Sequence, residues 1–132
     1  MDGVSKGLPA LLRAYKTQSK AANAGFDWSD KKDVWNKVKD ELGELQEALE
    51  KGDSKAAESE LGNVLFALVN YARHNKIEPE TALNGVNNCF TRRFGYVEQK
   101  VNESSREWKD FTLAELDKFW DAAKAKERGG TL

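Results

Sequence analysis

The fold predicted by this sequence is decided by Lys37-Val38-Lys39-Asp40-Glu41-Leu42-Gly43-Glu44-Leu45 and, after a polar break, by Glu60-Leu61-Gly62-Asn63-Val64-Leu65-Phe66. Both segments carry apolar residues at the spacing of amphipathic helices. Gly52, which lies between them, is a residue type that commonly follows the end of a helix. We therefore expect two helices joined by a short turn.

Each of these helices carries two oxygen-bearing side chains three residues apart, Glu41 with Glu44 and Glu60 with Asn63. Residues at this spacing lie on the same side of a helix. If the helices pack antiparallel, all four side chains can converge. Three carboxylates repel one another unless a cation lies between them, and Mg²⁺ prefers such oxygen ligands. From this pattern alone, solvated glutamates on two helix surfaces remain the more common arrangement.

The whole chain has 132 residues, which is enough for one domain with its own core. Only two prolines, Pro9 and Pro79, interrupt it, and long β-branched runs are missing. We therefore predict an all-α fold, a bundle of four to five helices. Residues 1–132 are expected to form a single helical domain with loose ends at 1–6 and 125–132.

Composition argues against several classes of protein. The net charge of -1 gives no basic field for a nucleic acid polymer. No apolar run approaches the roughly 20 residues of a membrane span, and the N-terminus lacks the apolar core of a signal peptide. The one cysteine, Cys89, excludes an intrachain disulfide and suits a reducing cytoplasm, where we expect the protein to act. A single histidine, His74, together with one cysteine cannot supply a zinc site.

Apolar residues at helical spacing mark the faces that we expect to be buried. On the second helix they are Val34, Val38, Leu42, Leu45 and Leu49. On the third they are Leu61, Val64, Leu65, Leu68 and Val69, and on the fourth Leu83, Val86, Phe90, Phe94, Val97 and Val101. Glu41 and Glu44 then flank a buried face. Apolar residues on nearly every helix, with four tryptophans, predict association, most simply a homodimer.

The helix ends are also marked in the sequence. We expect Ser29 to cap the second helix and Ser54 the third, Pro79 to open the fourth, and a capping box of Thr112 and Glu115 to start the last. Before the second helix, the connection Phe26-Asp27-Trp28 carries two aromatic residues. They either close the end of the bundle or form the wall of a pocket for a flat ring.

Several segments of the chain resemble the MazG family of nucleoside triphosphate pyrophosphohydrolases, in the all-α NTP pyrophosphatase superfamily. The similarity runs from Leu8-Pro9-Ala10-Leu11-Leu12-Arg13-Ala14 to Trp120-Asp121-Ala122-Ala123-Lys124. Segments close to the C-terminal domain of two-domain MazG proteins are Gly25-Phe26-Asp27-Trp28, Leu65-Phe66-Ala67-Leu68-Val69-Asn70, Ala72-Arg73-His74 and Phe90 with Arg92-Arg93-Phe94. The family pattern Glu-Glu-x-x-Glu followed by Glu-x-x-Asp stands here as Asp40-Glu41-Leu42-Gly43-Glu44 and Glu60-Leu61-Gly62-Asn63.

The resemblance implies a Mg²⁺-dependent enzyme that splits a ribo- or deoxyribonucleoside triphosphate into the monophosphate and pyrophosphate. It assigns Mg²⁺ to Glu41, Glu44, Glu60 and Asn63. It implies that Glu41 or Glu44 activates water and that Arg93 contacts phosphate. It places the nucleotide near Trp28, Asn87, Cys89, Arg93 and Trp120. Because adjacent side chains point about 100° apart on a helix, we expect at most one of Arg92 and Arg93 to face a given site.

The chain departs from the family pattern at three positions. Asp40 replaces a glutamate, Asn63 an aspartate, and Cys89 a lysine. The second change removes an anion from the metal side and the third a cation from the phosphate side. The alternatives are therefore a MazG-like nucleotide-binding protein with weakened or lost catalysis, and a helical oligomerisation module. The sequence also fits one helical domain of a longer two-domain protein.

Overall fold

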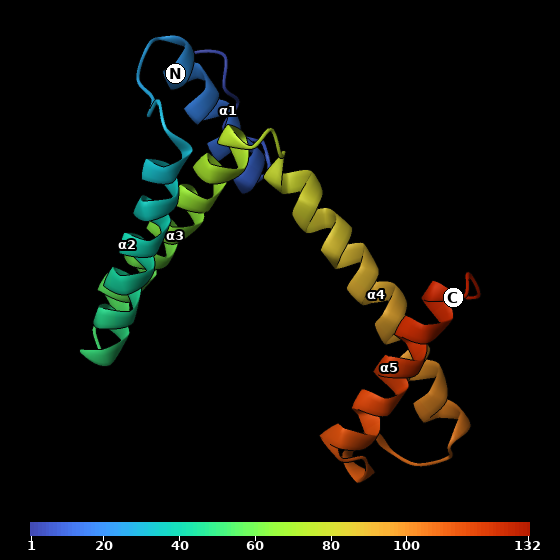
Figure 1. The fold of residues 1–132 in the computed structure, drawn as a ribbon. Helices are drawn as coiled ribbons and strands as arrows, with labels where there is room; N and C mark the ends of the chain where they lie inside the picture. Colours follow the sequence, from blue (N-terminus) through green and yellow to red (C-terminus); the bar gives the residue numbers. More distant parts are fainter. The chain divides into compact units, whose positions relative to one another are not determined.

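The chain folds into helices and connecting loops only. The computed structural model describes all 132 residues (Figure 1). The elements are α1 (Ala10–Asn23), α2 (Lys31–Glu50), α3 (Ser54–His74), α4 (Pro79–Glu103), the short 3-10 helix η1 (Trp108–Asp110) and α5 (Leu113–Arg128). The prediction of an all-α fold with four to five helices is confirmed. None of these helices combines the length and the apolar character that crossing a membrane requires.

Two compact units make up the chain, Met1–Ala82 and Leu83–Leu132. The first holds α1, α2 and α3, and the second holds most of α4 with η1 and α5. The expected single domain over residues 1–132 therefore stays a prediction. The end expected to be loose from residue 125 is helical as far as Arg128, because α5 continues that far.

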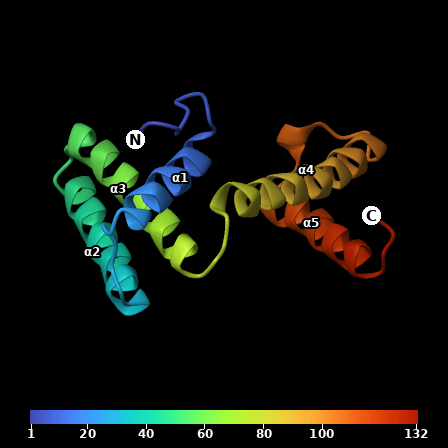
Figure 2. The same cartoon turned by 90° about the horizontal axis from the view of Figure 1, so that it is seen from above.

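The first unit is built on an antiparallel hairpin of α2 and α3, which lie side by side in both views, with α1 against α3 (Figures 1 and 2). Gly52 makes the turn between the two helices with a φ of 71°. Its N–H donates to the Leu49 carbonyl, and the Asp53 N–H donates to the Ala48 carbonyl. This pair of bonds is a Schellman motif, which satisfies the last free carbonyls of α2.

The predicted apolar faces of α2 and α3 are confirmed for their valines, since Val34, Val38, Val64 and Val69 are buried. Along the seam between the two helices, buried residues recur at steps of three, four or seven: Val34, Val38, Glu41 and Ala48 on α2, and Ala57, Val64 and Ala67 on α3. The two helices are therefore rotated so that valine and alanine side chains, and not most of the leucines, are buried. The predicted burial is therefore wrong for Leu42, Leu49, Leu61, Leu65 and Leu68, which are 42–61 % exposed.

The predicted helix starts are partly corrected. Asp30, not Ser29, caps α2 and accepts from the Lys32 N–H. Asp53, not Ser54, caps α3 and accepts from the Ala56 N–H. In both cases an aspartate stands next to the serine, and its negative charge also interacts favourably with the helix dipole. The capping box of Thr112 and Glu115 at the start of α5 is confirmed.

In the second unit, α5 packs along the later part of α4. Val97 and Val101 are buried as expected. The Phe90 ring lies tilted against Trp120 with ring centroids 5.2 Å apart, and the Phe94 ring stacks on Trp108 with centroids 5.5 Å apart. The predicted stripe is wrong for Leu83, Val86, Phe90 and Phe94, which are 37–64 % exposed, because the aromatic rings cover one another only in part.

Candidate metal centre

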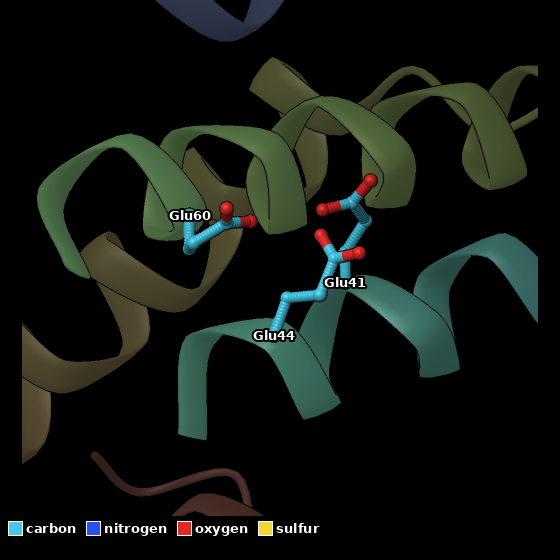
Figure 3. A group of neighbouring side chains, drawn as sticks. All are labelled: Glu41, Glu44 and Glu60. Atoms are coloured by element: carbon cyan, nitrogen blue, oxygen red, sulfur yellow. The ribbon is translucent and has the colours of Figure 1, made fainter. Parts of the chain in front are cut away.

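Three carboxylates converge between α2 and α3. Glu41 and Glu44 come from α2 and Glu60 from α3, and one oxygen of each lies within 4.8 Å of the others (Figure 3). The antiparallel packing of the hairpin produces this arrangement, because it brings the middle of α2 beside the first half of α3. The sequence-predicted carboxylates are thus neighbours in the folded chain.

The three carboxylates differ in burial. Glu41 occupies a seam position and is 6 % exposed, whereas Glu44 is open to solvent. This corrects the expectation that both glutamates flank the buried face. Glu41 Oε1 lies 2.8 Å from Lys37 Nζ, but Glu41 Oε2 is buried without a hydrogen-bond partner. A buried carboxylate oxygen without a partner is costly, and a bound cation would remove that cost.

The charges of the cluster act on one another. The hydrogen bond from Lys37 lowers the pKa of Glu41 below its ordinary value. Glu41, followed by Glu60, raises the pKa of Glu44. Like charges at this distance favour the protonated form of one member. A cation at this point would reverse that effect and let all three carboxyls ionise.

Asn63 completes the donor set expected from the sequence. It lies one turn after Glu60 on α3, and its Nδ2 donates to Glu60 Oε2 over 3.4 Å. Three carboxylates and one amide supply hard oxygen ligands, which is the donor chemistry that Mg²⁺ takes. The residues present therefore fit a divalent cation with this preference, although Asn63 contributes no charge to it.

A hollow of about 230 Å³ adjoins the cluster. Apolar atoms of Trp28 and Phe66 form part of its wall, and its polar residues include Lys37, Glu41, Asn63 and Asn70. Trp28 therefore lines a hollow, and Phe26, which is 82 % exposed, lines a second hollow of about 320 Å³ with Trp28. Lys37 was not among the predicted site residues, although its position one turn before Glu41 could have indicated it.

The remaining predicted residues lie in the second unit. Arg92 Nε and Arg93 Nε donate to different oxygens of Glu127, each over 2.8 Å. The expectation that only one of these arginines could face a given site is therefore wrong, because one carboxylate on α5 receives both. Arg93 also lies 5.7 Å from the centroid of the Trp120 ring. The unpaired thiol of Cys89 and the exposed Asn87 lie on the same helix as Arg93, and their roles stay predictions.

The model of the "MazG nucleotide pyrophosphohydrolase domain" matches residues 30–97, the segment that contains the whole cluster. The chain is 35 % identical over 117 residues to the Thermotoga maritima "Nucleoside triphosphate pyrophosphohydrolase/pyrophosphatase MazG", which covers 89 % of the chain and 45 % of that protein.

Two further relatives are similar to the chain in sequence. A "Nucleoside triphosphate pyrophosphohydrolase" of Escherichia coli K12 is 37 % identical over 129 residues, 96 % of the chain and 49 % of that protein. The "Uncharacterized protein YabN" of Bacillus subtilis is 50 % identical over 70 residues, 53 % of the chain and 14 % of that protein. The chain spans about half the length of the first two curated relatives. With its domain match over residues 30–97, this chain belongs to the MazG nucleotide pyrophosphohydrolase family.

Proposed function

We propose that this chain hydrolyses nucleoside triphosphates to the monophosphate and pyrophosphate. The observation that carries the proposal is the convergence of three carboxylates, one of which, Glu41, has a buried oxygen without a hydrogen-bond partner. Family membership and the names of the Thermotoga and Escherichia relatives supply the reaction class. In this reaction water adds to the α-phosphorus, the bond from that phosphorus to the bridging oxygen breaks, and pyrophosphate leaves.

The residues of the first unit divide the work. Glu41, Glu60 and Asn63 would hold Mg²⁺ together with Glu44. When bound, Mg²⁺ neutralises polyphosphate charge and polarises a phosphoryl oxygen. Lys37 holds Oε1 of Glu41 and so fixes the position of its carboxylate. Glu44 is the member open to solvent, and we assign it the proton that the attacking water loses.

We assign the nucleoside to the hollow beside Trp28 and Phe66, where a flat ring meets apolar walls. Arg93 is assigned to phosphate, with Glu127 holding its guanidinium until the substrate arrives. Asn87, Cys89 and Trp120 keep their predicted places near the nucleotide. Removing one charge-assisted contact from such a site commonly costs about 2–4 kcal/mol of transition-state stabilisation, so Asn63 and Cys89 should make the enzyme slow.

A pyrophosphate-release assay tests the proposal. The parent chain would meet a panel of ribo- and deoxyribonucleoside triphosphates with Mg²⁺, beside Glu44→Ala and the matched control Glu58→Ala. Glu58 is an exposed acid on α3, two residues before Glu60 and outside the cluster. We expect turnover by the parent and the control only. Turnover confined to Asn63→Asp with Cys89→Lys would instead identify a nucleotide-binding protein that has lost catalysis.

We also propose that the protein acts as a homodimer. The hairpin leaves Leu42, Leu49, Leu61, Leu65 and Leu68 exposed, and they lie on two adjacent helices. An apolar surface of this kind on a small domain is typical of an interface between subunits. Light scattering of the purified chain measures the mass directly, and a monomer at micromolar concentration would contradict the proposal.

A further inference from the structure

We propose that Asp27, Arg73 and His74 form a polar lock that positions Trp28 for nucleotide binding. These residues are 46 and 47 positions apart in the chain and come from the connection before α2 and the last turn of α3. The inference deepens the proposed function and rests on it, since it concerns the loop that lines the hollow beside the carboxylate cluster. Asp27, Arg73 and His74 are positioning residues, because none of them lies among the carboxylates or lines the hollow.

One oxygen of Asp27 is the centre of the lock. Arg73 Nη2 donates to Asp27 Oδ1 over 2.7 Å. His74 Nε2 lies 2.9 Å from the same oxygen and donates to it whenever that nitrogen carries a proton. The Trp28 main-chain N–H donates to it as well, over 2.8 Å. The side chains of Arg73 and His74 are 13 % and 12 % exposed, which keeps water from competing with these bonds.

The lock is the main attachment of this loop. Its aromatic side chains are not packed away, since Phe26 is 82 % and Trp28 is 46 % exposed. The Phe26 N–H closes the end of α1 by donating to the Ala21 carbonyl, and the next hydrogen bond outside the lock is the cap of α2 at Asp30. Between these two points, Asp27 is the residue that ties the loop to another element.

Asn70 connects the lock with the hollow. Its Oδ1 accepts from Arg73 Nη2 over 2.7 Å and from Arg73 Nε over 3.3 Å, and the residue is 6 % exposed. Asn70 also lines the hollow together with Trp28 and Glu41. The guanidinium of Arg73 is thus held on one side by a residue of the hollow wall and on the other by the loop that carries Trp28. Any loosening of Asp27 should therefore reach the nucleoside side of the site and leave the carboxylates in place.

The first arm of the test needs no substrate. Hydrogen exchange with mass spectrometry would follow peptides covering residues 24–32 and, as an internal reference, the hairpin turn at residues 49–55. We expect Asp27→Ala to speed exchange in 24–32 and not in 49–55. Asp27→Asn keeps an oxygen acceptor and should restore part of the protection. Asp33→Ala, an exposed acid in the first turn of α2, is the charge-matched control and should change neither segment.

The second arm separates binding from chemistry. We expect Asp27→Ala to raise the KM for the best triphosphate about tenfold, equivalent to one charge-assisted hydrogen bond, with kcat changed less than about twofold. The dissociation constant of an α,β-methylene triphosphate should rise by the same factor. A proportional loss of kcat with unchanged KM would overturn the positioning role, and so would an unchanged exchange rate in 24–32.

The outcomes also distinguish this proposal from the proposed function. A parent chain that binds the methylene analogue and hydrolyses nothing would refute the hydrolase proposal alone, and the dissociation constants would then decide the lock. A parent chain that neither binds nor hydrolyses would overturn both. Thermal unfolding of each variant, followed by circular dichroism, shows whether a change reflects the loop or the whole fold.

Discussion

Asp27 is the residue whose protonation should destabilise this fold most clearly at low pH. The hydrogen bond from Arg73 lowers the pKa of Asp27 from 3.8 to about 2; His74 acts in the same direction, and burial opposes both. The folded state therefore binds this proton less tightly than the unfolded state does. The stabilisation is complete above about pH 5 and is lost as the pH falls toward about 2.

We expect the unfolding free energy of the parent to fall more than that of Asp27→Asn between about pH 5 and about pH 2, because only the parent takes up this proton. Urea titrations at stepped pH measure the difference. Glu115, whose pKa is lowered to about 2 by Arg106, titrates in both proteins and cancels in the comparison. Parallel pH profiles for the two proteins would contradict the expectation.

Glu44 allows a second test at the same scale. Without a divalent cation, its charge lies beside Glu41 and Glu60, so Glu44→Gln should melt at or above the temperature of the parent. With Mg²⁺ the order should reverse, because the variant lacks a ligand. A cation at a hundred times its dissociation constant stabilises by about 2.7 kcal/mol. Differential scanning fluorimetry with EDTA and with a Mg²⁺ series measures this, and Glu58→Gln should respond to Mg²⁺ as the parent does.

At the scale of helices, each of the five α-helices is followed by a residue in the left-handed conformation. Three of these residues are glycines, Gly25, Gly52 and Gly130, whereas Lys76 follows α3 with a φ of 58° and Ser105 follows α4 with a φ of 61°. The Lys76 N–H still donates to the Arg73 carbonyl, and the Ile77 N–H donates to the Ala72 carbonyl. The motif is therefore complete, but a residue with a Cβ is strained in it.

We predict that Lys76→Gly raises the unfolding free energy by about 0.5–1 kcal/mol, since the relief of strain exceeds the added entropy of the unfolded chain. Gly52→Ala, at the same position of the motif after α2, should lower it by about 1 kcal/mol. An added Cβ meets open space at Gly52, so that loss comes from the backbone alone. Chemical denaturation of both variants measures the two changes in unfolding free energy. Changes of the same sign would refute the explanation by backbone strain.

The helices themselves were predictable because their signals are local. The break at Gly52, the start at Pro79 and the capping box at Thr112 each depend on a few neighbouring residues. The rotation of α2 and α3 was not predictable in this way. Leucines compete with valines and alanines for the buried side of these helices. Only packing against the partner helix decides which of them are buried. The same limit applies to Glu41, whose burial follows from that rotation.

At the scale of the whole molecule, the leucines left exposed by that rotation predict how two copies associate. Leu65→Lys places a charge in the middle of the exposed leucines and should convert the dimer to a monomer. Ser59→Lys adds the same charge to an exposed polar position of α3 and should leave the dimer intact. Size-exclusion chromatography with light scattering distinguishes the two. A dimer that survives Leu65→Lys would place the interface elsewhere.

Long-range contacts explain which parts of the site were predictable. The carboxylates were found because each pair is three residues apart and the two pairs lie on consecutive helices. Asp27 and Arg73 were not paired, because 46 residues separate them. A signal was nevertheless present: a charged residue between two aromatics, in a loop with no neighbouring cation, needs a partner from elsewhere. Less of the second unit was predictable, because Arg92 and Arg93 both pair with Glu127, which lies 35 and 34 residues further along the chain.

The seam position of Glu41 has a consequence for how this sequence can evolve. The other buried residues of α2 in this seam are apolar: Val34, Val38 and Ala48. Replacing a buried charge by a well-packed apolar residue often stabilises a protein by about 1–4 kcal/mol. Lys37, 49 % exposed, would simply return to water. Selection for stability and selection for catalysis therefore oppose each other at residue 41. Glu41→Leu should melt at a higher temperature than the parent and release no pyrophosphate.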